Sequence, residues 1–190
     1  MPTITTTDAG MVLDITTLTL VHTIISIVAI AAGLVVVGGL IAAVRIDGWT
    51  GIFLVTTALT SITGFFFPFT QLLASHWVGI ISLIILPFVI AARYWKELRG
   101  AWRGIYVVGT VLVLNLNFFI LNVQLFRRIP ALIVAAPKQT EPPFVLTQLL
   151  VLALFAWLGF AAFRRFRPQV VMTAKQATVP AAGALERSKS

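Results

Sequence analysis

Five long apolar runs constrain what this chain can fold into more than any other feature. They cover roughly residues 16–44, 52–69, 77–92, 104–126 and 144–163, and none contains an Asp, Glu, Lys or Arg. A hydrocarbon core of about 30 Å needs about 20 helical residues, and fewer where flanking side chains snorkel. Because lipid cannot hydrogen-bond the backbone, such a segment pairs its own peptide groups as a helix. The runs therefore predict an all-α integral membrane protein, a bundle of five transmembrane helices.

The composition excludes an ordinary soluble domain. Only 11% of the 190 residues are charged and 59% are hydrophobic, whereas soluble domains carry about 25% charged residues. We expect one membrane domain over 16–163, a short outer segment at 1–15 and a basic, disordered cytoplasmic tail at 164–190. The connections are too short for a separate catalytic domain, so an enzyme is not expected.

The net charge of +8 does not by itself indicate a binding partner, because the positions of the basic residues along the chain decide what they can contact. With five spans, eleven of the fourteen basic residues fall on one side: Arg45, Arg93, Lys96, Arg99, Arg103, Arg164, Arg165, Arg167, Lys175, Arg187 and Lys189. The other side receives Arg127, Arg128 and Lys138. The positive-inside rule then predicts an outer N-terminus and a cytoplasmic C-terminus. Nucleic acid is not expected as a partner, because the basic residues lie at span ends.

Residues 1–15 contain no Lys or Arg, so the positively charged start of a cleavable signal peptide is missing and the first span is expected to remain. The charge pattern fits a multi-pass protein of a bacterial inner membrane. The absence of cysteine excludes disulfides and thiolate chemistry.

Small and polar residues share one face of the first span. His22, Ser26, Ala29 and Gly33 follow a spacing of four, three and four, which is one helical stripe. Small residues on a stripe let membrane helices approach closely. This face is expected to point into the bundle.

The fourth span carries four amide side chains, Asn115, Asn117, Asn122 and Gln124. Asn115 and Asn122 share one face, and Asn117 and Gln124 share nearly the opposite one. An amide facing lipid is costly, so both faces are expected to meet protein. The span is therefore predicted to be the central helix, or to be covered on one side by a partner subunit.

The two histidines of the chain, His22 and His76, are both predicted near the outer leaflet. Two neutral imidazoles on neighbouring helices can ligate a b-type haem. This pair is the candidate cofactor site. The alternative is that each histidine is a packing residue. No inner histidine exists for a second haem, so a complete transmembrane reductase is not expected.

The outer segment between the last two spans contains Arg127, Arg128, Gln139 and Glu141 among several prolines. These charged groups can meet a phosphate or lipid headgroup, but no catalytic spacing joins them. We interpret the segment as an ordered, salt-bridged cap. The basic connection from Arg93 to Gly104 is interpreted as a topology determinant, with anionic lipid contact as the alternative.

These patterns lead to one functional hypothesis and one alternative. The first is a structural or accessory subunit that contacts membrane lipids and packs with itself or with a larger membrane complex. The alternative is a haem- or quinone-associated redox subunit that uses His22 and His76.

Overall fold

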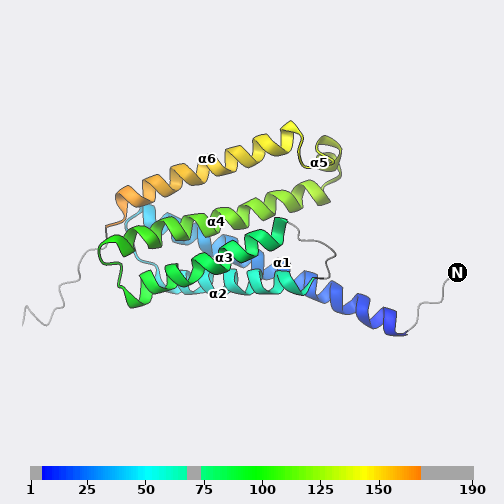
Figure 1. The fold of residues 1–190 in the computed structure, drawn as a ribbon, viewed down its shortest axis with the longest axis horizontal. Coiled ribbons are helices and arrows are strands. Elements are labelled where there is room, and N and C mark those ends of the chain that lie inside the picture. The colour runs from blue at the N-terminus through cyan, green and yellow to red at the C-terminus, as the bar shows by residue number, and fades with distance from the viewer. Residues whose placement is uncertain (1–5, 68–73, 168–190) are drawn as a thin grey trace, which may run out of the picture.

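The computed structural model describes residues 6–67 and 74–167, with side chains described for 16–67 and 75–167 (Figure 1). The elements are α1 (Thr6–Ile41), α2 (Asp47–Thr63), the 3₁₀ turn η1 (Gly64–Phe66), α3 (Ala74–Ile90), the π-helical turn η2 (Ala91–Trp95), α4 (Ala101–Arg128), the short α5 (Pro130–Ala135) and α6 (Pro142–Arg165). The described ranges contain no strand. Five of these segments are long and apolar enough to cross a membrane, so the described residues confirm the predicted all-α class and provide the five helices that the predicted plan requires.

The helices run past the uncharged stretches at both ends. α2 begins at Asp47, and α6 continues to Arg165 and is followed by the buried Phe166. The first residues assigned to a tail by sequence therefore belong to the bundle. α1 begins at Thr6, within the expected outer segment. At 1.5 Å per residue its 36 residues span about 54 Å, and its N-terminal part projects past the other helices (Figure 1).

α4 is the central helix of the bundle. It packs against α1, α3 and α6, while α2 packs against α1 and α3 (Figure 1). Ten of its residues are buried, among them Val107, Val113 and Leu114, whereas α6 buries only Phe155 and Ala162. The central position predicted from the four amides is confirmed, and α6 lies at the edge of the bundle.

Small residues let the helices of the core approach closely, as membrane packing requires. Ala29 is fully buried, and a Cβ at Gly33 would lie 2.5 Å from Leu114 of α4 and 2.8 Å from Phe53 of α2. A Cβ at Gly109 would lie 2.5 Å from Val89 of α3. The small-residue stripe of the first span therefore faces inward.

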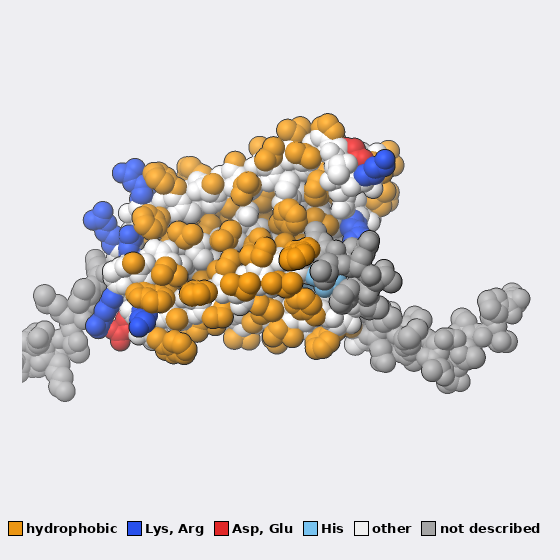
Figure 2. All heavy atoms as spheres, viewed as in Figure 1, with side chains coloured by type: hydrophobic (Ala, Val, Ile, Leu, Met, Phe, Trp, Pro, Cys, Tyr) orange, Lys and Arg blue, Asp and Glu red, His pale blue; other side chains and the backbone are white. Residues whose placement is uncertain are grey.

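Charged side chains gather at the two ends of the bundle, and apolar side chains cover the surface between them (Figure 2). One end, which we call the basic end, contains the α1–α2 loop with Arg45, the Arg93–Arg103 segment and the last turn of α6. The opposite end, which we call the histidine end, contains η1, α5, the starts of α3 and α6, and the part of α1 that carries His22. The apolar surface between the basic end and the histidine end is the band that a bilayer would surround.

Candidate functional site

His22 lies at the histidine end and is held by the next helix. Its Nδ1 is 2.8 Å from the Thr63 hydroxyl, which itself donates to the Leu59 carbonyl at 2.8 Å. Because Thr63 uses its only proton on the carbonyl, it accepts from His22, and the neutral ring therefore carries its proton on Nδ1. Nε2 is then the nitrogen with a lone pair, the form in which histidine binds iron or zinc.

His76 lies at the same end, on α3. Its side chain is buried, and its ring centroid is 5.7 Å from that of Phe65, whereas His22 makes an edge contact with Phe67 at 5.2 Å. The two histidines therefore flank the η1 turn, each against its own phenylalanine. Among the described residues, no group of three or more His, Asp or Glu side chains could hold a metal ion. Shared ligation by this pair stays a prediction.

The amides of α4 connect it to two different helices. Asn117 donates to Thr57 of α2 at 3.5 Å, and Asn122 donates to Thr147 at 3.2 Å and to Gln148 at 2.6 Å, both on α6. Asn115 has a buried oxygen with no hydrogen-bond partner, and Gln124 is half-buried. Opposite amide faces therefore meet protein within this chain, as the sequence predicted. These hydrogen bonds join Asn117 and Asn122 to neighbouring helices of the bundle.

The segment after α4 is an ordered cap fixed by backbone contacts. Gln139 donates to the Val123 carbonyl at 3.2 Å, and Glu141 accepts the amides of Lys138 at 3.2 Å and Thr140 at 3.0 Å. Arg127 and Arg128 are exposed. The ion pairs within the described ranges involve Asp47 and Glu97 only, so the salt bridge expected for Glu141 is replaced by backbone hydrogen bonds.

The hydrogen bonds to Glu141 also determine its acidity. Desolvation acts to raise the pKa of this carboxyl, but the bonds from backbone amides and the nearby Lys138 charge outweigh it, so the pKa is lowered. A carboxylate that accepts two N–H groups is favoured in its charged form.

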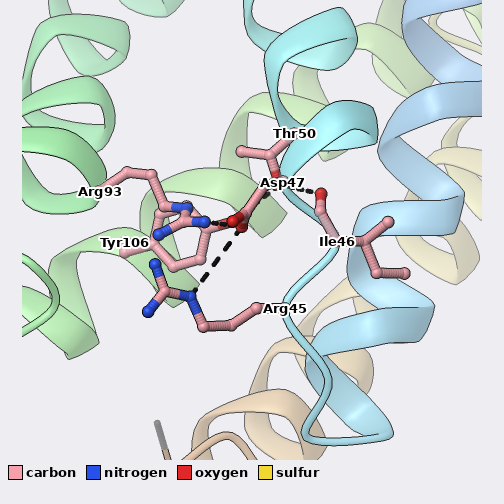
Figure 3. Close-up of polar contacts among 6 residues, drawn as sticks. All are labelled: Arg45, Ile46, Asp47, Thr50, Arg93 and Tyr106. Carbon is pink, nitrogen blue, oxygen red and sulfur yellow. Dashed lines mark hydrogen bonds and ion pairs between the residues drawn. The ribbon is translucent and has the colours of Figure 1, made fainter. Parts of the chain in front are cut away.

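A charged cluster that was not predicted from the sequence lies at the basic end (Figure 3). Arg93, whose side chain is only 5% exposed, forms an ion pair with Asp47 at the start of α2. Arg45, from the α1–α2 loop, places its Nε 3.9 Å from the same carboxylate oxygen. Arg45, two residues before Asp47, and Arg93, from a distant element, thus converge on one carboxylate.

Aromatic and hydroxyl groups support this cluster. The Arg93 guanidinium lies 6.0 Å from the ring centroid of Tyr106, within cation–π range. Thr50 donates to the Ile46 carbonyl at 2.9 Å and lies 3.2 Å from the Tyr106 hydroxyl, which therefore donates to Thr50. The ring of Phe166, just after α6, packs 6.0 Å from that of Tyr106.

A small, partly open cavity lies against this cluster. Arg45, Thr50, Arg93 and Tyr106 form its polar wall, and Val36, Leu40, Val44, Ile46 and Phe166 form its apolar wall. Guanidinium groups do not titrate in proteins, so the arrangement suits ion pairing and anion binding rather than proton transfer.

The sequence did contain a signal for Arg93. Ser82, Leu86, Val89 and Arg93 follow steps of four, three and four and are all buried, which is the inward stripe of α3. The sequence interpretation placed Arg93 in the basic connection, but Arg93 also continues this buried stripe. Asp47 gave no comparable signal, because its buried partner Arg93 comes from a distant element.

Comparison of the chain with known protein families, curated proteins and solved structures finds no significant match.

Proposed function

We propose that this protein is a structural or accessory subunit of a membrane, one that packs with itself or with a larger membrane complex. The observation that carries the proposal is the position of α6. This helix contacts the bundle along one stripe against α4 and α1, and the rest of its surface is uncovered apolar side chain, with Leu150 69% and Trp157 64% exposed.

Polar contacts fix α6 at both ends. Asn122 binds Thr147 and Gln148 near its start, and Arg103 donates to the carbonyls of Phe163 at 2.9 Å and Phe166 at 2.5 Å near its end. Because these contacts hold α6 at the edge of the bundle, its uncovered apolar surface is the face that this chain leaves for a second membrane protein to contact.

The proposed setting is a bacterial inner membrane, with the N-terminus outside and the C-terminus in the cytoplasm. Support comes from the basic end, which gathers Arg45, the Arg93–Arg103 segment and Arg164–Arg167. Basic residues of short connections remain on the cytoplasmic side during insertion.

Cysteine cross-linking tests the packing proposal directly, because the natural chain has no cysteine. Trp157→Cys on α6 and Phe88→Cys on the exposed face of α3 would be compared in native membranes with a bis-maleimide reagent. We expect an adduct of dimer mass or of a larger complex from Trp157→Cys and none from Phe88→Cys. Equal adducts from the two variants would show that proteins collide without a preferred face, and absent adducts would show that lipid alone covers α6. Either result would contradict the proposal.

A second candidate, a haem- or quinone-associated redox subunit, is favoured by one specific arrangement. His22 and His76 flank the same turn, and the Thr63 hydrogen bond leaves Nε2 of His22 as the ligating nitrogen. An absorption spectrum of the protein purified from its host membranes tests it. A Soret band that disappears in His76→Ala would support this candidate, and a colourless wild type would exclude a haem.

A further inference from the structure

The charges at the basic end do not balance. Arg99 pairs with Glu97 at 2.7 Å, Arg103 is occupied by two carbonyls of the α6 end, and Arg93 pairs with Asp47. Arg45 alone in this group has a distant partner, with its Nε 3.9 Å from an Asp47 oxygen that Arg93 already binds. Within the cluster of Arg45, Arg93 and Asp47, one carboxylate therefore serves two guanidiniums, which leaves this cluster with one net positive charge to attract an anion.

The spare charge lies at the mouth of a cavity with two kinds of wall. Arg45 is 42% exposed and lines the cavity together with the almost fully buried Arg93, while the apolar side includes Leu40 of α1 and Val44 of the α1–α2 loop. The exposed Trp49 lies in the first turn of α2, and tryptophan favours the level of the lipid headgroups. A ligand with an anionic group beside an apolar body matches these walls.

We propose that Arg45 and Arg93 bind the phosphate of an anionic phospholipid at this cavity. Guanidiniums match phosphate oxygens with paired N–H donors. The phosphate would bind at the open mouth, against Arg45 and the donors of Arg93 that Asp47 does not use, while the lipid glycerol and upper chains contact Val44 and the end of α1. The Asp47 carboxylate opposes an anion, but it fixes both guanidiniums in place. This site does not depend on the proposed subunit function.

Native mass spectrometry of the full chain in an uncharged detergent tests the proposal. The protein would be titrated with palmitoyl-oleoyl phosphatidylglycerol and with phosphatidylcholine of the same chains. We expect the first phosphatidylglycerol to bind about tenfold more tightly than phosphatidylcholine, the size expected of a charge-assisted hydrogen bond. Arg45→Gln should remove most of this preference. Arg45 is chosen because its side chain is half-exposed, so the fold should tolerate the change.

Arg99→Gln is the matched control, because Arg99 lies at the same end, is 82% exposed and is paired with Glu97. It should leave the preference unchanged. An equal loss in both variants would overturn the site in favour of diffuse surface charge, and the absence of any preference would overturn it altogether. A parallel arm adds inorganic phosphate at millimolar concentration. Displacement of phosphatidylglycerol would assign the site to free phosphate instead of a lipid, and unchanged binding supports the lipid.

Discussion

Gly33 of α1 packs directly against Leu114 of α4 and Phe53 of α2, and its replacement tests the packing of the core. Any side chain there meets Leu114 and Phe53 at less than 3.0 Å. Gly33→Leu should therefore lower the stability in detergent by about 1–3 kcal/mol, the usual cost of overpacking. Gly38→Leu is the control on the same helix, because a Cβ at Gly38 has no neighbour within 4 Å. Equal melting temperatures for the two variants would contradict the close contact.

Glu141 should make the cap after α4 sensitive to acid. Its pKa is lowered by the backbone amides that it accepts, so the folded state favours the carboxylate. Its contribution to stability is complete above the ordinary carboxyl pKa of 4.5, and it is lost as the pH falls through the lower, folded value. The melting temperature of Glu141→Gln should therefore lie below that of the wild type at pH 7, and the gap should narrow as the pH drops below 4.5. A gap that is constant with pH would show that the hydrogen bonds do not depend on the charge.

Among individual residues, those whose role is local were easier to predict than those whose role depends on another helix. The inward position of Gly33 follows from spacing along α1 alone. The ion pair between Arg93 and Asp47 joins residues 46 positions apart, and nothing within either segment specifies the other. The salt bridge expected for Glu141 was wrong for a related reason, since the nearest donors proved to be backbone amides.

At the scale of elements, α6 depends on Arg103 for the position of its last turn. The guanidinium satisfies the carbonyls of Phe163 and Phe166 and lies 4.8 Å from the Phe163 ring centroid. Helix C-termini favour such cations. Arg103→Gln should lower the stability by about 1–2 kcal/mol, near the lower range for bonds to charged groups because one of the two bonds is exposed. Amide hydrogen exchange in the last turn of α6 should also rise.

Arg165→Gln is the control for this change, because Arg165 is exposed at the end of the same helix. It removes a positive charge near the α6 dipole without removing the contacts that Arg103 makes. If both variants raised hydrogen exchange equally, the effect would belong to the charge and not to the carbonyl contacts.

The helices themselves were predictable, but their arrangement was predictable only in part. The uncharged runs predicted five helices long and apolar enough to cross a membrane, and the amides of α4 indicated its central position. The edge position of α6 was not predicted, because a lipid-facing helix and a core helix of a membrane protein are equally apolar. The helices also extend past the uncharged runs, since α2 begins at Asp47 and α6 ends at Arg165. A long charged side chain at a helix end can reach water while its backbone stays helical.

At the scale of the whole molecule, the five helices and the charge at each end make the topology testable. The structure brings Arg45, the Arg93–Arg103 segment and Arg164–Arg167 to one end, and Lys138 lies with the cap at the other. Reporters fused after Gly48, after Trp102 and at the C-terminus should therefore be cytoplasmic, and a reporter after Lys138 should be outside. Because each connection lies between consecutive crossings, four or six spans would bring one terminus to the opposite side. A reporter after Lys138 on the same side as the C-terminal reporter would mean that α6 does not cross the membrane. In that case its exposed apolar surface would lie along the bilayer, and α6 could not serve as the membrane face of a subunit contact.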